Sequence, residues 1–175
     1  MAGYWQNAGG TQFPFIELGG SFFGLDSLLP SNIDAQATDV NNAGMISGFY
    51  VIPGGVNHGF LLNGTAETTI DFPSSTFTQA FGLNNVGQVS GFYVDAGGQM
   101  HGFVDGMFQS IDDPNGIGTT PVNGINDKGQ VVGFYVDANG NTDGFVATPA
   151  PEPASTILFG TALAAGLVFL RKRGS

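Results

Sequence analysis

Residues 80–106 read AFGLNNVGQVSGFYVDAGGQMHGFVDG, and a similar run lies on either side of them. The first is ATDVNNAGMISGFYVIPGGVNHGFLLNG at residues 37–64, and the last is VNGINDKGQVVGFYVDANGNTDGFVAT at residues 122–148. Self-similarity at a fixed period indicates a repeat architecture, in which each repeat buries its apolar surface against its neighbours. The sequence therefore predicts a chain built of stacked repeats.

Three glycines set the period, because Gly48, Gly91 and Gly133 occupy equivalent positions that are 43 and then 42 residues apart. A partial copy comes before them, since GYWQNAGGTQFPF from Gly3 aligns without a gap with GFYVDAGGQMHGF from Gly91. The predicted β-repeat region is residues 3–148, divided into a partial repeat at 3–36 and repeats at 37–79, 80–121 and 122–148.

Each period divides into four short segments separated by turn residues. In the second copy the predicted strands are residues 80–83, 88–94, 100–104 and 107–112. The Asn, Asp and Gly residues between them are typical of hairpin loops, because Gly adopts positive φ readily and Asn or Asp tolerates the left-handed region. Each repeat is therefore predicted to be a four-stranded antiparallel meander.

The second strand of every repeat carries consecutive apolar residues, Phe-Tyr-Val, where a half-exposed strand would alternate apolar and polar side chains. Sheets that stack on one another bury both faces, and a four-stranded period of about 43 residues has the size of a propeller blade. The predicted fold is all-β and propeller-like, with 14 strands that form a closed or an incomplete ring. An elongated stack or β-solenoid and a β-sandwich are the alternatives.

The repeat resembles a bacterial extracellular repeat family named HAF after His-Ala-Phe. The resemblance rests on Gly-Ile-Asn-Asp-Lys-Gly-Gln-Val-Val-Gly at residues 124–133 and on His-Gly-Phe at residues 58–60 and 101–103. The last copy departs with Asp-Gly-Phe at residues 143–145, and the partial copy departs with Phe-Pro-Phe at residues 13–15. The resemblance covers about residues 3–148 and implies export, without an established activity.

The first residues begin in the middle of a repeat and contain no basic segment followed by an apolar stretch, which a secretory signal peptide needs. We expect this chain to be the C-terminal part of a longer gene product or to have a misplaced start.

Charge is segregated along the chain. Thirteen acidic residues and one basic residue, Lys128, precede residue 151, so this part carries a formal charge of −12. Binding to a nucleic-acid backbone depends on Lys and Arg, so nucleic acid is excluded as an expected partner. Cysteine is absent, which excludes disulfides, thiolate metal sites and a cysteine nucleophile.

The last 27 residues differ from the repeats. Pro149-Ala150-Pro151-Glu152-Pro153 is a stiff, extended break, residues 154–170 carry no charge, and Arg171-Lys172-Arg173 follow. At 1.5 Å per residue, a helix over 154–170 spans about 25 Å, near the short limit for crossing a bilayer. The basic cluster would keep its end in the cytoplasm and place the repeats outside. The sequence predicts a transmembrane helix; a helix buried in the domain is the alternative, which the lack of a polar face disfavours.

This order of elements resembles the PEP-CTERM sorting signal, with Pro151, Glu152 and Pro153 as the motif and Arg171, Lys172 and Arg173 as the basic end. The resemblance implies recognition by an exosortase, a membrane-embedded cysteine protease of Gram-negative bacteria that make exopolysaccharide, which cuts near the motif. The membrane helix would then be temporary, as in other C-terminal signals whose tail is removed. The implied route is an inner-membrane-anchored precursor that becomes a cell-surface or matrix protein.

Two histidines, His58 and His101, lie one period apart and could share a metal ion. The favoured interpretation is that each makes a hydrogen bond within its own repeat. Asp26, Asp71 and Asp112 also recur with the period, which points to turn architecture rather than catalysis.

Two further candidate sites have an architectural alternative. Asp137, Asn139, Asn141 and Asp143 have the alternate spacing of a calcium loop but lack its sixth-position Gly and distal Glu, so an Asn-Gly hairpin turn is favoured. Tyr4, Trp5 and the repeated Phe-Tyr pairs could form a sugar-stacking rim, although core packing is favoured.

Two classes of function remain open. The leading one is a non-enzymatic structural or interaction protein of the cell surface or exopolysaccharide matrix that needs no cofactor. The alternative is an extracellular glycan-binding, lectin-like protein or a glycan-processing propeller. No Gly-x-Ser-x-Gly, phosphate-binding Gly-Lys-Ser/Thr or His-Glu-x-x-His motif is present in the sequence.

Overall fold

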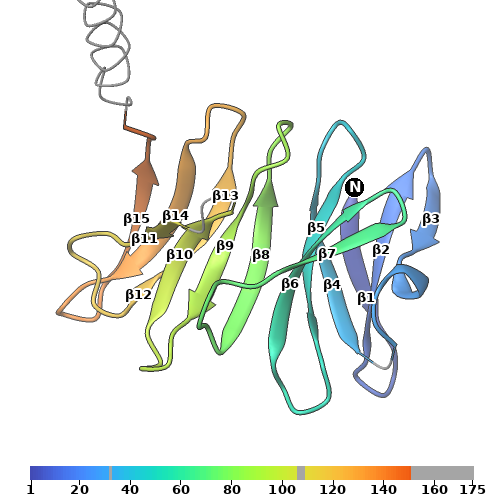
Figure 1. The fold of residues 1–175 in the computed structure, drawn as a ribbon, viewed down its shortest axis with the longest axis horizontal. Helices are drawn as coiled ribbons and strands as arrows, with labels where there is room; N and C mark the ends of the chain where they lie inside the picture. The colour runs from blue at the N-terminus through green and yellow to red at the C-terminus, as the bar shows by residue number, and fades with distance from the viewer. Residues whose placement is uncertain (32, 106–108, 151–175) are drawn as a thin grey trace, which may run out of the picture.

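The computed structural model describes residues 1–150 except residues 32 and 106–108, and in this part the chain forms four antiparallel sheets (Figure 1). Sheet 1 contains β1 (Ala2–Gln6), β2 (Gln12–Leu18) and β3 (Ser21–Gly24). Sheet 2 contains β4 (Asp34–Val40), β5 (Ile46–Val51), β6 (Asn57–Asn63) and β7 (Ala66–Ile70). Sheet 3 contains β8 (Phe77–Leu83), β9 (Val89–Val94), β10 (Met100–Val104), β11 (Gln109–Ile111) and β12 (Thr119–Thr120). Sheet 4 contains β13 (Val122–Ile125), β14 (Val131–Val136) and β15 (Thr142–Ala147).

The predicted all-β class and meander are confirmed, because consecutive strands pair antiparallel within each sheet. Two small elements were not predicted. A 3₁₀ helix, η1 (Asp26–Leu28), interrupts the connection from sheet 1 to sheet 2. The two-residue β12 pairs in parallel with β10, so the described chain has 15 strands where the sequence predicts 14.

The four sheets lie in an open row, with sheet 1 and sheet 4 at opposite ends (Figure 1). No propeller closure is found in these residues, and the open row fits the incomplete ring and the elongated stack that the sequence allows. The reason lies in the junctions between the sheets. β4 packs on β1 and β2, β8 packs on β5 and β6, and β13 packs on β8 and β9. Each first strand thus covers the preceding sheet, and the sheets follow one another along the molecule.

Sheet 4, at one end of the row, exposes apolar side chains that the equivalent sheets bury or replace. Val132 is 48 % exposed and Val146 is 69 % exposed, whereas Ser47 and Ser90, which are equivalent to Val132 in sheets 2 and 3, are fully buried. In sheet 2, Phe49 and Tyr50 are both buried, so the prediction that the Phe-Tyr segment is covered on both faces is confirmed there. A face of sheet 4 remains uncovered because no described sheet follows it.

The glycines that set the period face phenylalanine rings across the sheet. The register pairs are Gly3 with Phe15, Gly48 with Phe60, Gly91 with Phe103 and Gly133 with Phe145. A Cβ atom on Gly48 would lie 2.1 Å from the Gln36 carbonyl oxygen and 2.5 Å from the Phe60 ring. Glycine is therefore required where the first strand and the phenylalanine ring approach the second strand closely.

A β-bulge in the first strand recurs at these positions. The register shifts between Ala37 and Asp39 in β4, between Ala80 and Gly82 in β8, and between Val122 and Gly124 in β13. Each bulge inserts one extra residue opposite the second strand, so it bends the first strand locally. The repeat in the sequence therefore corresponds to a repeated irregularity of the backbone.

The turns between the first and second strands of sheets 2, 3 and 4 are connected to one another by hydrogen bonds. In each turn the side-chain carbonyl oxygen of an asparagine (Asn41, Asn84 or Asn126) accepts hydrogen bonds from two backbone N–H groups of the same turn. The Asn41 amide then donates to the Asn84 carbonyl oxygen at 3.0 Å, and the Asn84 amide donates to the Asn126 carbonyl oxygen at 3.1 Å. One asparagine side chain thus closes its own turn and ties it to the next repeat.

A second set of hydrogen bonds, between Asn85 and Asp127, joins the last two turns, and its contribution to stability should decrease in acid. The Asn85 side-chain amide and backbone N–H donate to Asp127 at 2.9 and 2.8 Å, and they hold the pKa of the Asp127 carboxyl below its usual range. The stabilisation is present above the unfolded-state pKa of about 3.9 and is lost as the pH falls through the lower folded-state pKa. We expect the Tm difference between the native chain and Asp127→Asn to shrink on acidification from pH 5 to pH 2. A constant difference would contradict this.

Candidate functional site

The predicted sorting signal follows the end of sheet 4. β15 ends at Ala147, and Thr148, Pro149 and Ala150 are exposed. The motif residues Pro151, Glu152 and Pro153, the predicted span at residues 154–170 and the basic residues Arg171, Lys172 and Arg173 lie outside the described residues. Within residues 1–150, apart from the gaps at 32 and 106–108, no helix is long and apolar enough to cross a bilayer. The transmembrane helix therefore stays a prediction.

His58 and His101 each bond an aspartate of the connection that follows their own sheet. The Nδ1 atom of His58 lies 2.9 Å from Asp71 Oδ2, and the Nδ1 atom of His101 lies 2.8 Å from Asp112 Oδ1. Each imidazole also stacks on the tyrosine opposite it in the sheet, with ring centroids 5.4 Å apart for Tyr50 and 5.1 Å apart for Tyr93. These contacts are those of histidines that support their own repeat.

His101 has an additional acidic neighbour, Asp95, whose Oδ2 lies 3.5 Å from its Nε2. Hydrogen bonds from the turn, led by the backbone N–H of Gln99, lower the pKa of Asp95. Among the described residues, no group of three or more His, Cys, Asp or Glu side chains is arranged to hold a metal ion.

Asp26 stands in the place of Asp71 and Asp112 but lacks their histidine, because Phe13 occupies the position of His58 and His101. Within the described part of the chain, the Asp26 carboxylate makes no hydrogen bond or ion pair. Sequence reasoning grouped the three aspartates as turn residues and missed this difference. The sequence did contain a signal for this difference, because the first repeat keeps the aspartate, Asp26, but replaces its histidine partner with Phe13.

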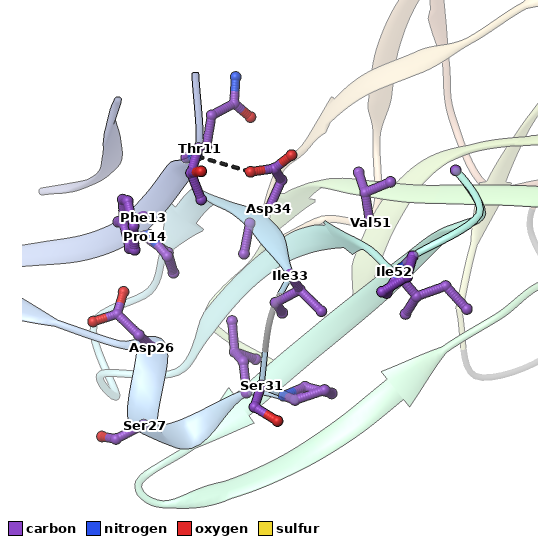
Figure 2. A pocket seen from close by; sticks show the side chains of 16 residues that line it. Thr11, Phe13, Pro14, Asp26, Ser27, Ser31, Ile33, Asp34, Val51 and Ile52 are labelled. Atoms are coloured by element: carbon purple, nitrogen blue, oxygen red, sulfur yellow. Dashed lines mark hydrogen bonds between the residues drawn. The ribbon is translucent and has the colours of Figure 1, made fainter. Parts of the chain in front are cut away.

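The Asp26 carboxylate borders a cleft of about 940 Å³ between sheet 1 and sheet 2. β2 contributes Phe13 and Pro14, while the start of β4, the end of β5 and the loop after β5 form the opposite side. Figure 2 shows Phe13, Pro14 and Asp26 facing Val51 and Ile52 across the cleft, with Ile33 between the two sides. The cleft is larger than two other cavities, of about 260 and 300 Å³, and combines an apolar lining with a few polar groups, as ligand sites do.

Several oxygen atoms of the cleft are available to a ligand. One Asp34 oxygen accepts the backbone N–H of Gln12 at 3.0 Å, the contact dashed in Figure 2, which leaves the second oxygen without a described partner. The side chains of Ser27 and Ser31 also line the cleft. Local structure positions these groups: η1 carries Asp26 and Ser27, and the buried Leu25 and Leu29 anchor the chain on either side of it.

The segment with the spacing of a calcium loop forms a hairpin turn between β14 and β15. Asp137 Oδ1 accepts the backbone N–H groups of Asn139 and Asn141, both at 2.8 Å, and Oδ2 accepts the Asn141 side-chain amide at 3.0 Å. These bonds, led by those from Asn141, lower the pKa of the Asp137 carboxyl. The turn is thus closed by its own N–H groups, and calcium binding by Asp137, Asn139, Asn141 and Asp143 stays the less favoured alternative.

Comparisons with known proteins identify the C-terminal segment alone. Neither the curated proteins nor the solved structures contain a match to this chain. The family model that does match describes the PEP-CTERM protein-sorting motif, and it covers residues 149–173. This motif implies an exported protein that is anchored in a membrane before an exosortase processes it. The chain therefore carries a PEP-CTERM sorting signal after the four β-sheets of its described residues.

Proposed function

We propose that this chain is a non-enzymatic structural or interaction protein of the cell surface or exopolysaccharide matrix. The observation that carries the proposal is the sorting signal at residues 149–173. The segment begins immediately after the last strand, at exposed residues, so a protease can reach it without unfolding sheet 4. Removal of the tail then releases or reattaches the repeats outside the membrane.

The repeats suit a display role. Their polar side chains serve the architecture at most positions: the asparagines close turns, and the histidines bond aspartates of the same repeat. The formal charge of −12 before residue 151, from thirteen acidic residues and one lysine, keeps such surfaces apart and soluble. The resemblance of the repeats to the HAF family supports an extracellular placement.

A lectin-like role is the second candidate. It is favoured by one observation, the cleft between sheets 1 and 2, whose lining combines apolar side chains with Asp26, Ser27 and Asp34.

Replacing Pro151, Glu152 and Pro153 together with alanine should abolish processing, because the protease then lacks its recognition motif. The chain is expressed in a Gram-negative host that has an exosortase, and the mature C-terminus is read by mass spectrometry. We expect the native protein to lose Arg171, Lys172 and Arg173, and the variant to keep them in the membrane fraction. The control is Pro114→Ala, which changes an exposed proline far from the motif.

Secreted native protein that still ends in the basic cluster would contradict processing. Cleavage of the triple variant at the native position would show that the motif is not what the protease recognises.

A further inference from the structure

We propose that the cleft between sheet 1 and sheet 2 binds a neutral, polyhydroxylated ligand, a segment of a glycan chain. The proposal deepens the lectin-like candidate function and rests on it. It is carried by a comparison of two equivalent junctions in the same molecule, by the charge of the cleft and by an aromatic pair at its edge.

The cleft is larger than the equivalent space at the second junction because two large side chains of that junction are absent here. Between sheets 2 and 3 the equivalent space measures about 260 Å³, against about 940 Å³ between sheets 1 and 2. Phe72 and Phe77 line the smaller space, and the Phe72 ring stacks on Tyr93 with centroids 3.7 Å apart. In the first junction Ser27 follows Asp26 as Phe72 follows Asp71, and Asp34 begins its strand as Phe77 does.

The connection between the sheets is also longer at the first junction. Asp34 comes eight residues after Asp26, whereas Phe77 comes six residues after Asp71. The longer connection carries η1 at the side of the cleft. Smaller side chains and a longer connection together open a space that the second junction fills with two phenylalanines, so this space can admit a ligand.

The charge of the cleft selects its ligand. Asp26 and Asp34 supply carboxylates, which only accept hydrogen bonds when ionised. No lysine or arginine lines the cleft, since Lys128 is the only such residue in the described part of the chain and lies in the turn between β13 and β14 of sheet 4. An anionic ligand would be repelled. A ligand rich in hydroxyl donors satisfies the carboxylates and the serine side chains at once.

The remaining lining fits the C–H surfaces of sugar rings. Pro14, Ile33 and Ile52 are apolar, and Phe13 lies at the edge with its ring stacked on Trp5, centroids 4.5 Å apart and planes inclined by 16°. Trp5 is 52 % exposed, so the aromatic pair extends a rigid apolar surface outward from Phe13. This alternation of apolar and hydrogen-bonding surface matches the two sides of a pyranose ring.

Trp5 also provides the measurement, because it is the only tryptophan of the chain. The full chain, kept in a detergent without a sugar head group, is titrated with neutral glucose-, galactose- and mannose-based tetrasaccharides while Trp5 fluorescence is recorded. We expect saturable binding of at least one neutral tetrasaccharide, and no binding of a uronic-acid tetrasaccharide of the same length.

Two variants test the place of binding. Asp26→Ala removes an acceptor that bears charge and should weaken binding about tenfold or more. Ser27→Phe restores the residue type of the second junction and should weaken binding similarly by filling the cleft. The matched control is Asp71→Ala, which removes the equivalent carboxylate at the filled junction and should leave the affinity unchanged.

The proposal is overturned if no neutral tetrasaccharide binds saturably, or if Asp26→Ala and Asp71→Ala bind equally well. Binding of oligolysine in place of the sugars would show that the cleft is a cation site and would also overturn it. Because Asp26 is exposed, its variant should fold and remain informative if Ser27→Phe does not. The processing assay reads the C-terminus and this titration reads the cleft, so either proposal can fail alone.

Discussion

Gly91→Ala is expected to lower the free energy of unfolding by about 3 kcal/mol, at the upper end of the usual cost of overpacking. A Cβ atom at this position would lie 2.0 Å from the carbonyl oxygen of Gln79 and 3.0 Å from the Cα atom of Ala80. Both neighbours are backbone atoms of β8, which itself packs on sheet 2, so neither can move aside without disturbing the junction. Tm should fall by roughly 6–12 °C for a chain of this size.

Gly3→Ala is the matched control, because Gly3 aligns with Gly91 in the repeat but has no first strand beside it in sheet 1. Its nearest neighbour for a Cβ atom is the tip of the Phe15 ring at 3.0 Å, which can shift. We expect a loss of less than about 1 kcal/mol, within the range of a tolerated substitution. Thermal unfolding followed by circular dichroism measures both variants, and equal losses would contradict the role assigned to the first strand.

Asn84→Ala is expected to cost about 2–4 kcal/mol, because it removes one buried side chain that makes several hydrogen bonds. Asn84 is 3 % exposed. Its Oδ1 accepts the backbone N–H groups of Val86 and Gln88, and its Nδ2 donates to the Gln88 side chain and to the Asn126 carbonyl oxygen. The variant thus opens its turn and breaks a link between sheets 3 and 4.

Asn126→Ala separates these two contributions. Asn126 makes the same bonds within its own turn, to Lys128, Gln130 and the Gln130 side chain, but has no described turn after it. Its loss should be about 1 kcal/mol, the usual cost of exposed local hydrogen bonds. Chemical denaturation compares the two variants. If Asn126→Ala costs as much as Asn84→Ala, the link between repeats contributes nothing measurable.

Asn84→Ala breaks a hydrogen bond between sheets 3 and 4, and Gly91→Ala disturbs β8, the strand of sheet 3 that packs on sheet 2. In a linear array each repeat contacts only its neighbours, so stability is approximately a sum of repeat and junction contributions. The row in Figure 1 has three such junctions, between sheets 1 and 2, 2 and 3, and 3 and 4. Substitutions within a junction should therefore weaken the row more than equivalent substitutions at its ends.

Prediction from the sequence worked where the signal is local and repeated. The strands at 88–94 and 100–104 correspond to β9 (Val89–Val94) and β10 (Met100–Val104), because apolar segments between Gly, Asn and Asp turns carry a strong pattern. It failed for β12, whose two residues pair in parallel with β10 and leave no periodic trace. It also missed the cleft, since each of Phe13, Ser27 and Asp34 is unremarkable when read alone.

The sequence by itself determined the period, the meander, the turns and the sorting signal, because these depend on residue types within a few positions of one another. Only the tertiary structure decided that the sheets form an open row and that one junction is hollow. Those properties depend on which side chains meet at each junction. Ser27 and Asp34 line the space between sheets 1 and 2, whereas Phe72 and Phe77 line the equivalent space between sheets 2 and 3. Contacts of that kind join residues about one repeat apart, so no local pattern contains them.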